Sequence, residues 1–342
     1  MSKITRRRVL AGVVALAASA GLAACGSKNS DETTTTTAAA TETTAATETT
    51  AATETTAAAL TGTGKTIAIV SPYYSNQPAT KEVVDAFKTA AEAKGYTVTL
   101  VDTKGDLAAV NGEMTNAVSQ KASAIVLGMG DPKEFSAGLK AAKDANVPVF
   151  GLDAGSADGV TANFTSDNDF LGKTSAQALL DAVAPGKNVI VIHFDPFEPV
   201  RLRGAAAREL FTAQGVTVLE DIQGDPADST GFAKTTILDL LTKYPKGKLD
   251  GIWVAWDASA LGAYQATVEA GRTEVKVVGV DGQDFARAEI KKADSNWIAT
   301  VRQDWAGIAN KAVTDIDALL NGGAAPAAVV VVPGELITAA NA

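Results

Sequence analysis

The sequence has one cysteine, Cys25, and one histidine, His193, in 342 residues. A single cysteine cannot form a disulfide within the chain. A single histidine leaves almost no material for the Ser-His-Asp and Cys-His arrangements of nucleophilic catalysis, and metal sites built from histidine and cysteine clusters are excluded on the same ground. We therefore expect no resident metal, no cofactor and no enzymatic activity.

Positive charge is also scarce, because 30 lysines and arginines face 39 aspartates and glutamates, a net charge of −9. Four of those cations lie within residues 1–24, which contain no acidic residue, so the chain after residue 24 carries −13. Nucleic-acid binding depends on cationic contacts to phosphate. The charge therefore argues against a nucleic-acid partner.

The stretch Gly64-Lys65-Thr66 has the end of a phosphate-binding loop but lacks its beginning. A P-loop requires a glycine five residues before Gly64, where this chain has Ala59, and it requires a helix after the lysine. Here the apolar run Ile67–Val70 follows and indicates a strand instead. The two glycines therefore indicate the end of a flexible leader and not a nucleotide site.

Residues 1–24 have the pattern of a signal peptide, with a basic start followed by the apolar run Val9–Ala24, which is too short for a membrane-spanning helix. Leu22-Ala23-Ala24-Cys25-Gly26 resembles the bacterial lipobox, so we expect Cys25 to be lipidated and to become the mature N-terminus. The triple arginine Arg6–Arg8 also resembles a twin-arginine export signal. These features predict an extracytoplasmic protein held at the outer face of the cell membrane by its lipid.

Residues 25–63 have low complexity, with Ala-Ala-Thr-Glu-Thr-Thr repeated at 39–44, 45–50 and 51–56. The repeat contains no large apolar residue, so it cannot offset the entropy lost on ordering. We interpret the segment as a disordered tether.

After Lys65, short β-branched runs alternate with amphipathic stretches of helical periodicity, a pattern typical of an α/β fold with parallel sheets covered on both faces. Expected strands are 66–71, 97–102, 124–128, 147–153, 188–192, 217–222, 251–255, 276–280 and 298–302. Expected helices are 80–94, 109–120, 132–145, 200–214, 230–243, 259–270, 285–293 and 305–321. The pattern restarts near residue 188, which indicates two lobes of similar size.

Polar residues stand at the ends of five expected strands: Ser71, Asp153, Asp257, Asp281 and Gln303. Ligands of open parallel sheets bind beyond the carboxyl ends of the strands. Any one of these residues could instead cap a helix or a turn. Together they predict a cleft between the two sheet edges.

Residues from about 65 to 338 resemble the type I periplasmic sugar-binding proteins, the ribose-binding-protein group. The resemblance is carried, in order, by Ile67–Ser71, Phe150–Asp153, Thr165–Asn168, Val200–Gly204, Ala255–Asp257 with Ala260–Gly262, Val277–Gly282 and Ala299–Gln303. It implies two Rossmann-like lobes joined by a three-crossing hinge. The corresponding expected ranges are 64–166 plus 304–332 for the N-terminal lobe and 167–303 plus 333–342 for the C-terminal lobe.

The same resemblance implies a ligand and a partner. It implies a monomer that captures a small sugar or polyol and delivers it to the permease subunits of an ABC importer. Carried over by position, the ligand contacts are Asp153, Arg201, Asp281 and Gln303. Carboxylates accept hydrogen bonds from sugar hydroxyls, and arginine donates in a fixed fork.

The sequence also departs from ribose binders, which carry an arginine where Ala154 stands and an asparagine where Trp256 stands. The aromatic platform of the site has therefore moved, and its candidates are Trp256, Tyr73, Tyr74, Phe194 and Phe197. The full expected ligand set is Ser71, Tyr73, Tyr74, Asn76, Asp153, Arg201, Trp256, Asp257, Asp281 and Gln303.

Three alternatives remain at the level of sequence. The chain could be a sensor that presents a sugar-like signal to a membrane receptor. Asp153 and Asp281 could be a glycosidase pair, although a pair of sugar-binding carboxylates would look the same. A transcription regulator of the lac-repressor type shares the fold, but the lipobox and the lack of an N-terminal helix-turn-helix argue against it.

Overall fold

The computed structural model describes Leu60–Ala342. The predicted signal peptide, the lipidation site Cys25 and the tether up to residue 59 lie outside the described residues. The described residues form one compact unit. Within residues 60–342, no helix is both long enough and apolar enough to cross a membrane.

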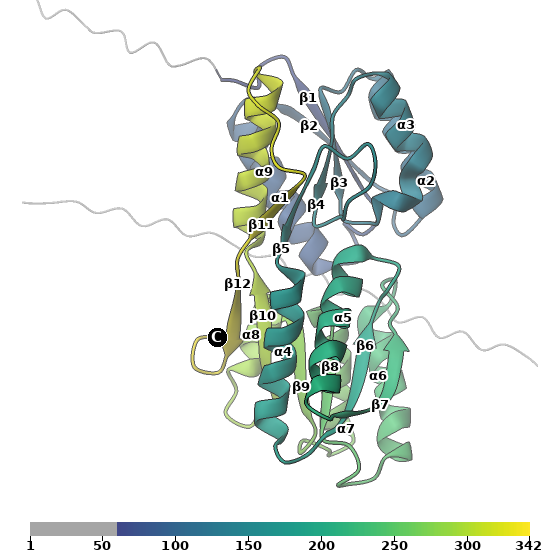
Figure 1. The fold of residues 1–342 in the computed structure, drawn as a ribbon, viewed down its shortest axis with the longest axis vertical. Coiled ribbons are helices and arrows are strands. Elements are labelled where there is room, and N and C mark those ends of the chain that lie inside the picture. Colours follow the sequence, from purple (N-terminus) through teal and green to yellow (C-terminus); the bar gives the residue numbers. More distant parts are fainter. Residues whose placement is uncertain (1–59) are drawn as a thin grey trace, which may run out of the picture. The chain divides into compact units, whose positions relative to one another are not determined.

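The described chain forms two six-stranded sheets, one in each lobe (Figure 1). The first sheet has the order β11-β5-β4-β3-β1-β2 and is parallel throughout. Its strands are β1 (Thr66–Ser71), β2 (Thr97–Asp102), β3 (Ala124–Gly128), β4 (Val149–Leu152), β5 (Ala162–Ser166) and β11 (Val329–Val332).

The second sheet has the order β12-β10-β9-β8-β6-β7 and is parallel except for β12, which runs antiparallel to β10. Its strands are β6 (Asn188–His193), β7 (Thr217–Gln223), β8 (Gly251–Val254), β9 (Lys276–Asp281), β10 (Trp297–Gln303) and β12 (Gly334–Thr338). The two orders correspond strand by strand, which is the repetition expected from the sequence.

Helices cover both faces of each sheet (Figure 1). Those of the first lobe are α1 (Pro78–Ala93), α2 (Leu107–Ser119), the 3₁₀ turn η1 (Pro132–Phe135), α3 (Ser136–Asp144) and α9 (Trp305–Leu320). Those of the second lobe are α4 (Asn168–Val183), α5 (Glu198–Ala213), α6 (Ser229–Lys243), α7 (Asp257–Glu269) and α8 (Asp284–Ile290).

Three segments of the described chain pass between the lobes. The first follows β5 at Ser166, the second follows β10 at Gln303, and the third lies between β11 and β12 around Pro333. In each sheet the strands that flank these crossings lie at one side of the sheet. The side of the two sheets where these strands lie is therefore the hinge side, and we call the opposite side the mouth side.

Local sequence explains the element boundaries. The central strands are buried along most of their length, as expected for parallel strands covered on both faces. Asp106, Asp167, Asp228 and Asp304 each precede a helix and accept a hydrogen bond from a backbone N–H three residues later. Such caps satisfy amide groups that have no partner within the helix.

These elements confirm the predicted α/β fold of two lobes. The strands at Thr66–Ser71, Thr97–Asp102 and Ala124–Gly128 have the predicted bounds. The helix expected over 132–145 is divided into η1 and α3. The sequence pattern did not predict α4, β5, β11 and β12, because α4 begins inside the polar Thr165–Asn168 motif and the three strands are only four or five residues long.

Gly172 in α4 permits an unusually close approach of α5. A Cβ atom at this position would lie 2.1 Å from the backbone oxygen of Arg203 in α5, a distance that real Cβ atoms do not adopt. The contact fixes how deeply α5 sits against α4. It thereby fixes the position of the Arg203 side chain, which reaches the interlobe cavity.

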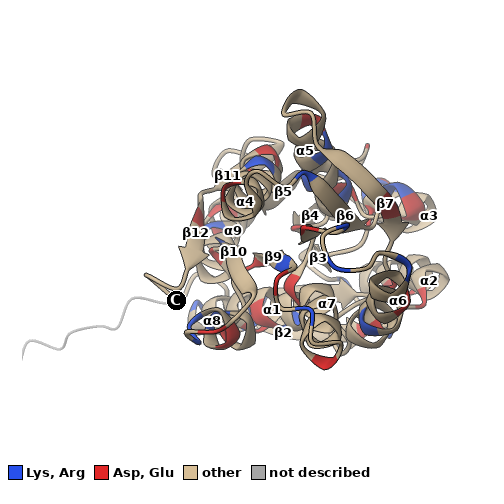
Figure 2. Ribbon diagram, turned by 90° about the horizontal axis from the view of Figure 1, so that it is seen from below, with Lys and Arg blue, Asp and Glu red and all other residues tan. Residues whose placement is uncertain are grey.

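Charged residues of both signs are distributed over the outer helices in the view of Figure 2. Ion pairs between neighbouring helical turns, such as Lys81–Asp85 in α1 and Lys311–Asp315 in α9, account for part of this mixture. Exposed pairs of this kind contribute little to stability.

Candidate functional site

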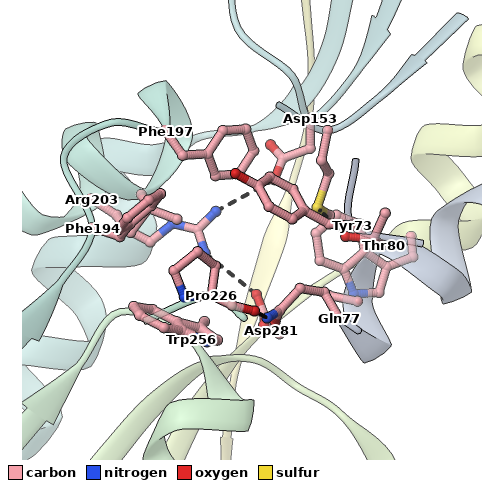
Figure 3. A pocket seen from close by; sticks show the side chains of 14 residues that line it. Tyr73, Gln77, Thr80, Asp153, Phe194, Phe197, Arg203, Pro226, Trp256 and Asp281 are labelled. Atoms are coloured by element: carbon pink, nitrogen blue, oxygen red, sulfur yellow. Dashed lines mark hydrogen bonds and ion pairs between the residues drawn. The ribbon is translucent and has the colours of Figure 1, made fainter. Parts of the chain in front are cut away.

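A cavity of about 50 Å³ lies between the lobes, at the carboxyl ends of the strands of both sheets (Figure 3). Both lobes contribute to its wall. The lining residues are Tyr73, Gln77, Ala79, Thr80, Met129, Asp153 and Trp305 from the first lobe, and Phe194, Phe197, Val200, Arg203, Pro226, Trp256 and Asp281 from the second. This is the position that the strand-end residues predict.

Three charged side chains meet in this cavity, and we call them the charged triad: Asp153, Arg203 and Asp281. The guanidinium of Arg203 lies 3.5 Å from the carboxylate of Asp153 and 3.3 Å from that of Asp281. Dashed lines in Figure 3 mark the two ion pairs. Because Asp153 belongs to the first lobe and the other two residues to the second, the triad bridges the cleft.

Arg203 is held firmly, with only 1% of its surface exposed. Its Nε donates to the side-chain oxygen of Asn168, the first residue of α4, and its Nη1 donates to the backbone oxygen of Ala255. These bonds fix the plane of the guanidinium within the second lobe. The remaining donors are directed toward the two carboxylates.

Arg201, predicted to supply the arginine of the site, does not line this cavity. Arg201 lies at the rim, where it donates to the backbone oxygen of Asp195 and approaches Asp131 and Glu198 at 3.7 and 3.5 Å. An α-helix turns about 100° per residue, so Arg201 and Arg203, two residues apart in α5, point to different faces of the helix. Val200 and Arg203, three residues apart, share the face that lines the cavity.

Both aspartates of the triad stand at unusual backbone angles. Asp153 has φ 49° and Asp281 has φ 124°, and non-glycine residues rarely adopt positive φ. Such angles persist only where the surrounding structure holds them, and they are common at ligand sites. Here they direct the carboxylates that follow β4 and β9 into the cleft.

Burial governs the acidity of these carboxyl groups. It raises the pKa of Asp153, against the opposing effects of Arg203 and of the hydrogen bond from the Thr165 hydroxyl. It raises the pKa of Asp281 to about 7, again against Arg203 and against the hydrogen bond from Gln303. One guanidinium therefore does not fully offset the burial of two carboxylates.

Of the ten residues predicted to bind ligand, four line the cavity: Tyr73, Asp153, Trp256 and Asp281. Gln303 stands behind Asp281, and its Nε2 donates to the carboxylate at 3.0 Å. It is therefore placed to orient Asp281.

Asp257, which is also predicted to bind ligand, does not line the cavity. It is fully buried, and it accepts hydrogen bonds from the backbone N–H of Gln283 and from the hydroxyl of Thr300. Burial, and then the charge of Asp281, raise the pKa of Asp257 well above its ordinary value. Its role in the structure is to hold the turn that follows β9.

Three further predicted residues lie outside the cavity wall. Ser71 is fully buried and donates to the backbone oxygen of Gly128 at 2.6 Å. Tyr74 donates to Asp85 on the first turns of α1. Asn76 has a buried side-chain oxygen with no hydrogen-bond partner within residues 60–342. Strand-end and loop positions predicted where these residues lie in the fold, but not the direction of their side chains.

Aromatic rings form much of the remaining wall. Tyr73 and Phe197 meet edge to face across the lobes, with centroids 6.4 Å apart and planes at 62°. The indole nitrogen of Trp256 donates to the hydroxyl of Ser229, which leaves the ring at the cavity. The predicted platform candidates Phe194 and Phe197 also line the cavity, whereas Tyr74 does not.

Several lining residues were not predicted from the sequence: Gln77, Ala79, Thr80, Met129, Val200, Arg203, Pro226 and Trp305. Most are apolar or small, so no chemical signal distinguishes them from core residues. Arg203 is the only charged residue among them, and it lies on the same face of α5 as Val200.

The lobes also touch each other directly, both at the cavity wall and beyond it. Gln77 donates to the hydroxyl of Ser229 at 2.9 Å, and Gln283 donates to Glu82 at 2.9 Å. Glu198 accepts from the backbone N–H of Ser156 and pairs with Lys133. The structure therefore has the lobes closed on each other. In the described part of the chain, no group of three or more His, Cys, Asp or Glu residues could hold a metal ion.

The sequence matches the periplasmic binding protein domain family over residues 67–324, and the chain belongs to this family. The D-apiose import binding protein of Actinobacillus succinogenes is 29% identical over 261 residues, which cover 75% of this chain and 82% of the relative. The ribose import binding protein of Escherichia coli is 26% identical over 260 residues, with 75% and 85% coverage.

Solved structures agree with this assignment. An ABC transporter solute-binding protein from Agrobacterium vitis with bound allitol is 27% identical, with a TM-score of 0.76 over 80% of this chain and 95% of that chain. A solute-binding protein from Mycobacterium smegmatis with bound glycerol is 26% identical, with a TM-score of 0.74 over 81% and 95%.

Proposed function

We propose that this chain is an extracytoplasmic solute-binding protein that captures a small sugar or polyol between its lobes and delivers it to the permease of an ABC importer. The observation that carries the proposal is the charged triad, buried in the cleft and contributed by both lobes. Relatives named as import binding proteins for D-apiose and ribose, and structures with bound allitol and glycerol, support the ligand class.

The site suits recognition of hydroxyl groups. A carboxylate accepts hydrogen bonds from two neighbouring hydroxyls, and a guanidinium donates to hydroxyl oxygens in a fixed geometry. A closed cleft excludes water and strengthens each of these bonds. The proposed role is binding without chemistry, because Arg203 lies between the two carboxylates and pairs with both.

Ligand binding and lobe closure are coupled in this proposal. Asp153 approaches a ligand from one lobe, and Asp281 and Arg203 approach it from the other, so only the closed form makes all contacts. A ligand that prefers one conformation shifts the population toward it. In this proposal the protein is a monomer, and its closed form is the state that would meet the permease.

A thermal-shift screen tests the proposed ligand class. We expect at least one compound from a panel of pentoses, hexoses, inositols and sugar alcohols to raise the melting temperature. A ligand at 1,000 times its dissociation constant stabilises the native state by about 4 kcal/mol. Amino acids of similar size are the control panel, and stabilisation by those compounds alone would contradict the proposal.

Cys25 is proposed as the site of lipid anchoring. Replacing Cys25 with serine removes the thiol that would carry the lipid, so the variant should leave the membrane fraction and appear in the soluble fraction. Paired acyl chains anchor stably where a single chain does not. Fractionation in high salt measures the effect, and a Cys25→Ser protein that still pellets with membranes would contradict the anchor.

A further inference from the structure

The polar and the apolar groups of the cavity lie on different sides of it, and the strand order in the two sheets defines these sides. Asp153 follows β4 and Asp281 ends β9, and each of these strands lies next to a strand that leads into a lobe crossing, β5 or β10. Arg203 joins the two carboxylates, and Trp305 follows the second crossing directly. The charged groups of the cavity are therefore gathered on the hinge side.

The opposite side of the cavity is built from the strands farther from the hinge. The loops after β1, β3, β6, β7 and β8 supply Tyr73, Met129, Phe194, Pro226 and Trp256. Phe197, the residue before α5, and Val200, in the first turn of α5, continue this surface. The mouth side of the cavity is therefore aromatic and aliphatic.

Three polar groups of the mouth side, those of Thr80, Trp256 and Gln77, already have contacts within the protein. The hydroxyl of Thr80 lies 2.9 Å from the sulfur of Met129, and the indole N–H of Trp256 and the amide of Gln77 both donate to Ser229. A ligand hydroxyl placed among them would be desolvated with little to bond to. A methyl or thioether group would instead meet surfaces of its own polarity.

The hinge side has polar groups still to be satisfied. Trp305 lines the cavity, and its indole N–H is buried without a hydrogen-bond partner among the described residues. The side-chain oxygen of Gln303, behind Asp281 and outside the cavity wall, also has none among these residues. Buried polar atoms are seldom left unpaired. This indole N–H is therefore a hydrogen-bond donor that a ligand oxygen would satisfy.

We propose that the ligand is amphipathic: a small sugar or polyol with neighbouring hydroxyls at one end and a deoxygenated or alkyl-substituted carbon at the other. The hydroxyls bind the charged triad and the indole N–H of Trp305. The apolar end lies under Phe194, Phe197 and Met129. This inference rests on the proposed function and specifies the substrate class of the same site.

The size of the cavity limits the ligand further. Its volume of about 50 Å³ is well below the roughly 150 Å³ of a protein cavity that accepts benzene. A pentose-sized compound therefore enters only as the lobes part, and a compact ligand fits better than a disaccharide.

Matched pairs of compounds test the proposal by calorimetry on the purified exported protein. The pairs are D-ribose with 5-deoxy-D-ribose and D-allose with 6-deoxy-D-allose. We expect the deoxy member of the better-binding pair to bind at least tenfold more tightly, because it places no hydroxyl at the apolar end. Equal or tighter binding of the fully hydroxylated member overturns the inference while leaving the proposed function intact, and failure of all four compounds and of the wider polyol panel overturns both.

Two variants test the apolar end and the hydroxyl-binding end of the site independently. Met129→Gln adds an amide of similar length to the apolar end, so it should reduce the preference for the deoxy compound at least threefold. Asp281→Asn alters the hydroxyl end, so it should weaken both members of a pair by the same factor. If Met129→Gln leaves the preference for the deoxy compound unchanged, or if Asp281→Asn abolishes it, the apolar end lies elsewhere. Either result overturns the assignment.

Discussion

Replacing Arg203 with methionine should lower the free energy of unfolding by roughly 3–5 kcal/mol at pH 7 and abolish tight ligand binding. The substitution leaves Asp153 and Asp281 facing each other in a buried cleft without their shared guanidinium. Breaking a buried ion pair by removing one partner carries a cost of this size, because a charge stays buried without compensation. Denaturant unfolding and calorimetry measure the two effects.

Arg201→Met is the matched control, because it makes the same change two residues earlier in the same helix. The Arg201 side chain is 35% exposed and pairs with Asp131 and Glu198 at the rim. Exposed pairs are worth about 0–1 kcal/mol, so we expect a small loss of stability and an affinity close to that of the parent. If Arg201→Met loses more affinity than Arg203→Met, the assignment of Arg203 to the site is wrong.

Asp281→Asn should weaken ligand binding at least tenfold. The carboxylate is fixed from behind by Gln303 and faces the cavity, so a ligand hydroxyl would donate to it. A hydrogen bond to a charged acceptor contributes about 1.5–3 kcal/mol, and 1.4 kcal/mol corresponds to a factor of ten. Asp195→Asn is the control, because Asp195 lies outside the cavity wall and its side chain is 41% exposed. A tenfold loss in the control with no loss in Asp281→Asn would contradict the assignment.

The same variant should change the dependence of stability on pH. Burial raises the pKa of Asp281 to about 7 in the folded protein, above the ordinary value of 3.8. Between these two values the native state holds a proton that the unfolded chain has released, so this group's contribution to stability is complete below pH 3.8 and is lost as pH rises through 7. The parent should therefore lose more stability than Asp281→Asn between pH 4 and pH 7.5 without ligand. Parallel unfolding curves across this range would contradict the raised pKa.

The fold could be predicted from the sequence because parallel strands and their covering helices have distinct apolar patterns. Buried strands such as Ile67–Val70 are continuous apolar runs, and the helices that follow them have a period of 3.6 residues. Helix α4 escaped prediction because its first residues belong to the polar segment that leads from the hinge. The short strands β11 and β12 are defined by pairing with β5 and β10, which only the tertiary structure provides.

The site was only partly predictable, because position at a strand end does not fix the direction of a side chain. Asp153 and Asp281 follow apolar strands and face the cleft, and the positive φ angles of both residues direct them there. Ser71 and Asp257 occupy comparable positions but turn back into their lobes, where local hydrogen bonds satisfy them. The choice between Arg201 and Arg203 depended on the helical register of α5, which begins at Glu198.

A crystal structure with the tightest-binding compound of the sugar and polyol panel tests the central claim most directly. The account predicts the compound between the lobes, with hydroxyl oxygens about 2.5–3.2 Å from the carboxylate of Asp281 and the guanidinium of Arg203. It also predicts that the face or end of the compound with fewest hydroxyls lies against Phe197 and Met129. A compound bound at the rim, in contact with Arg201 and Glu198 and not with Arg203, would contradict the account.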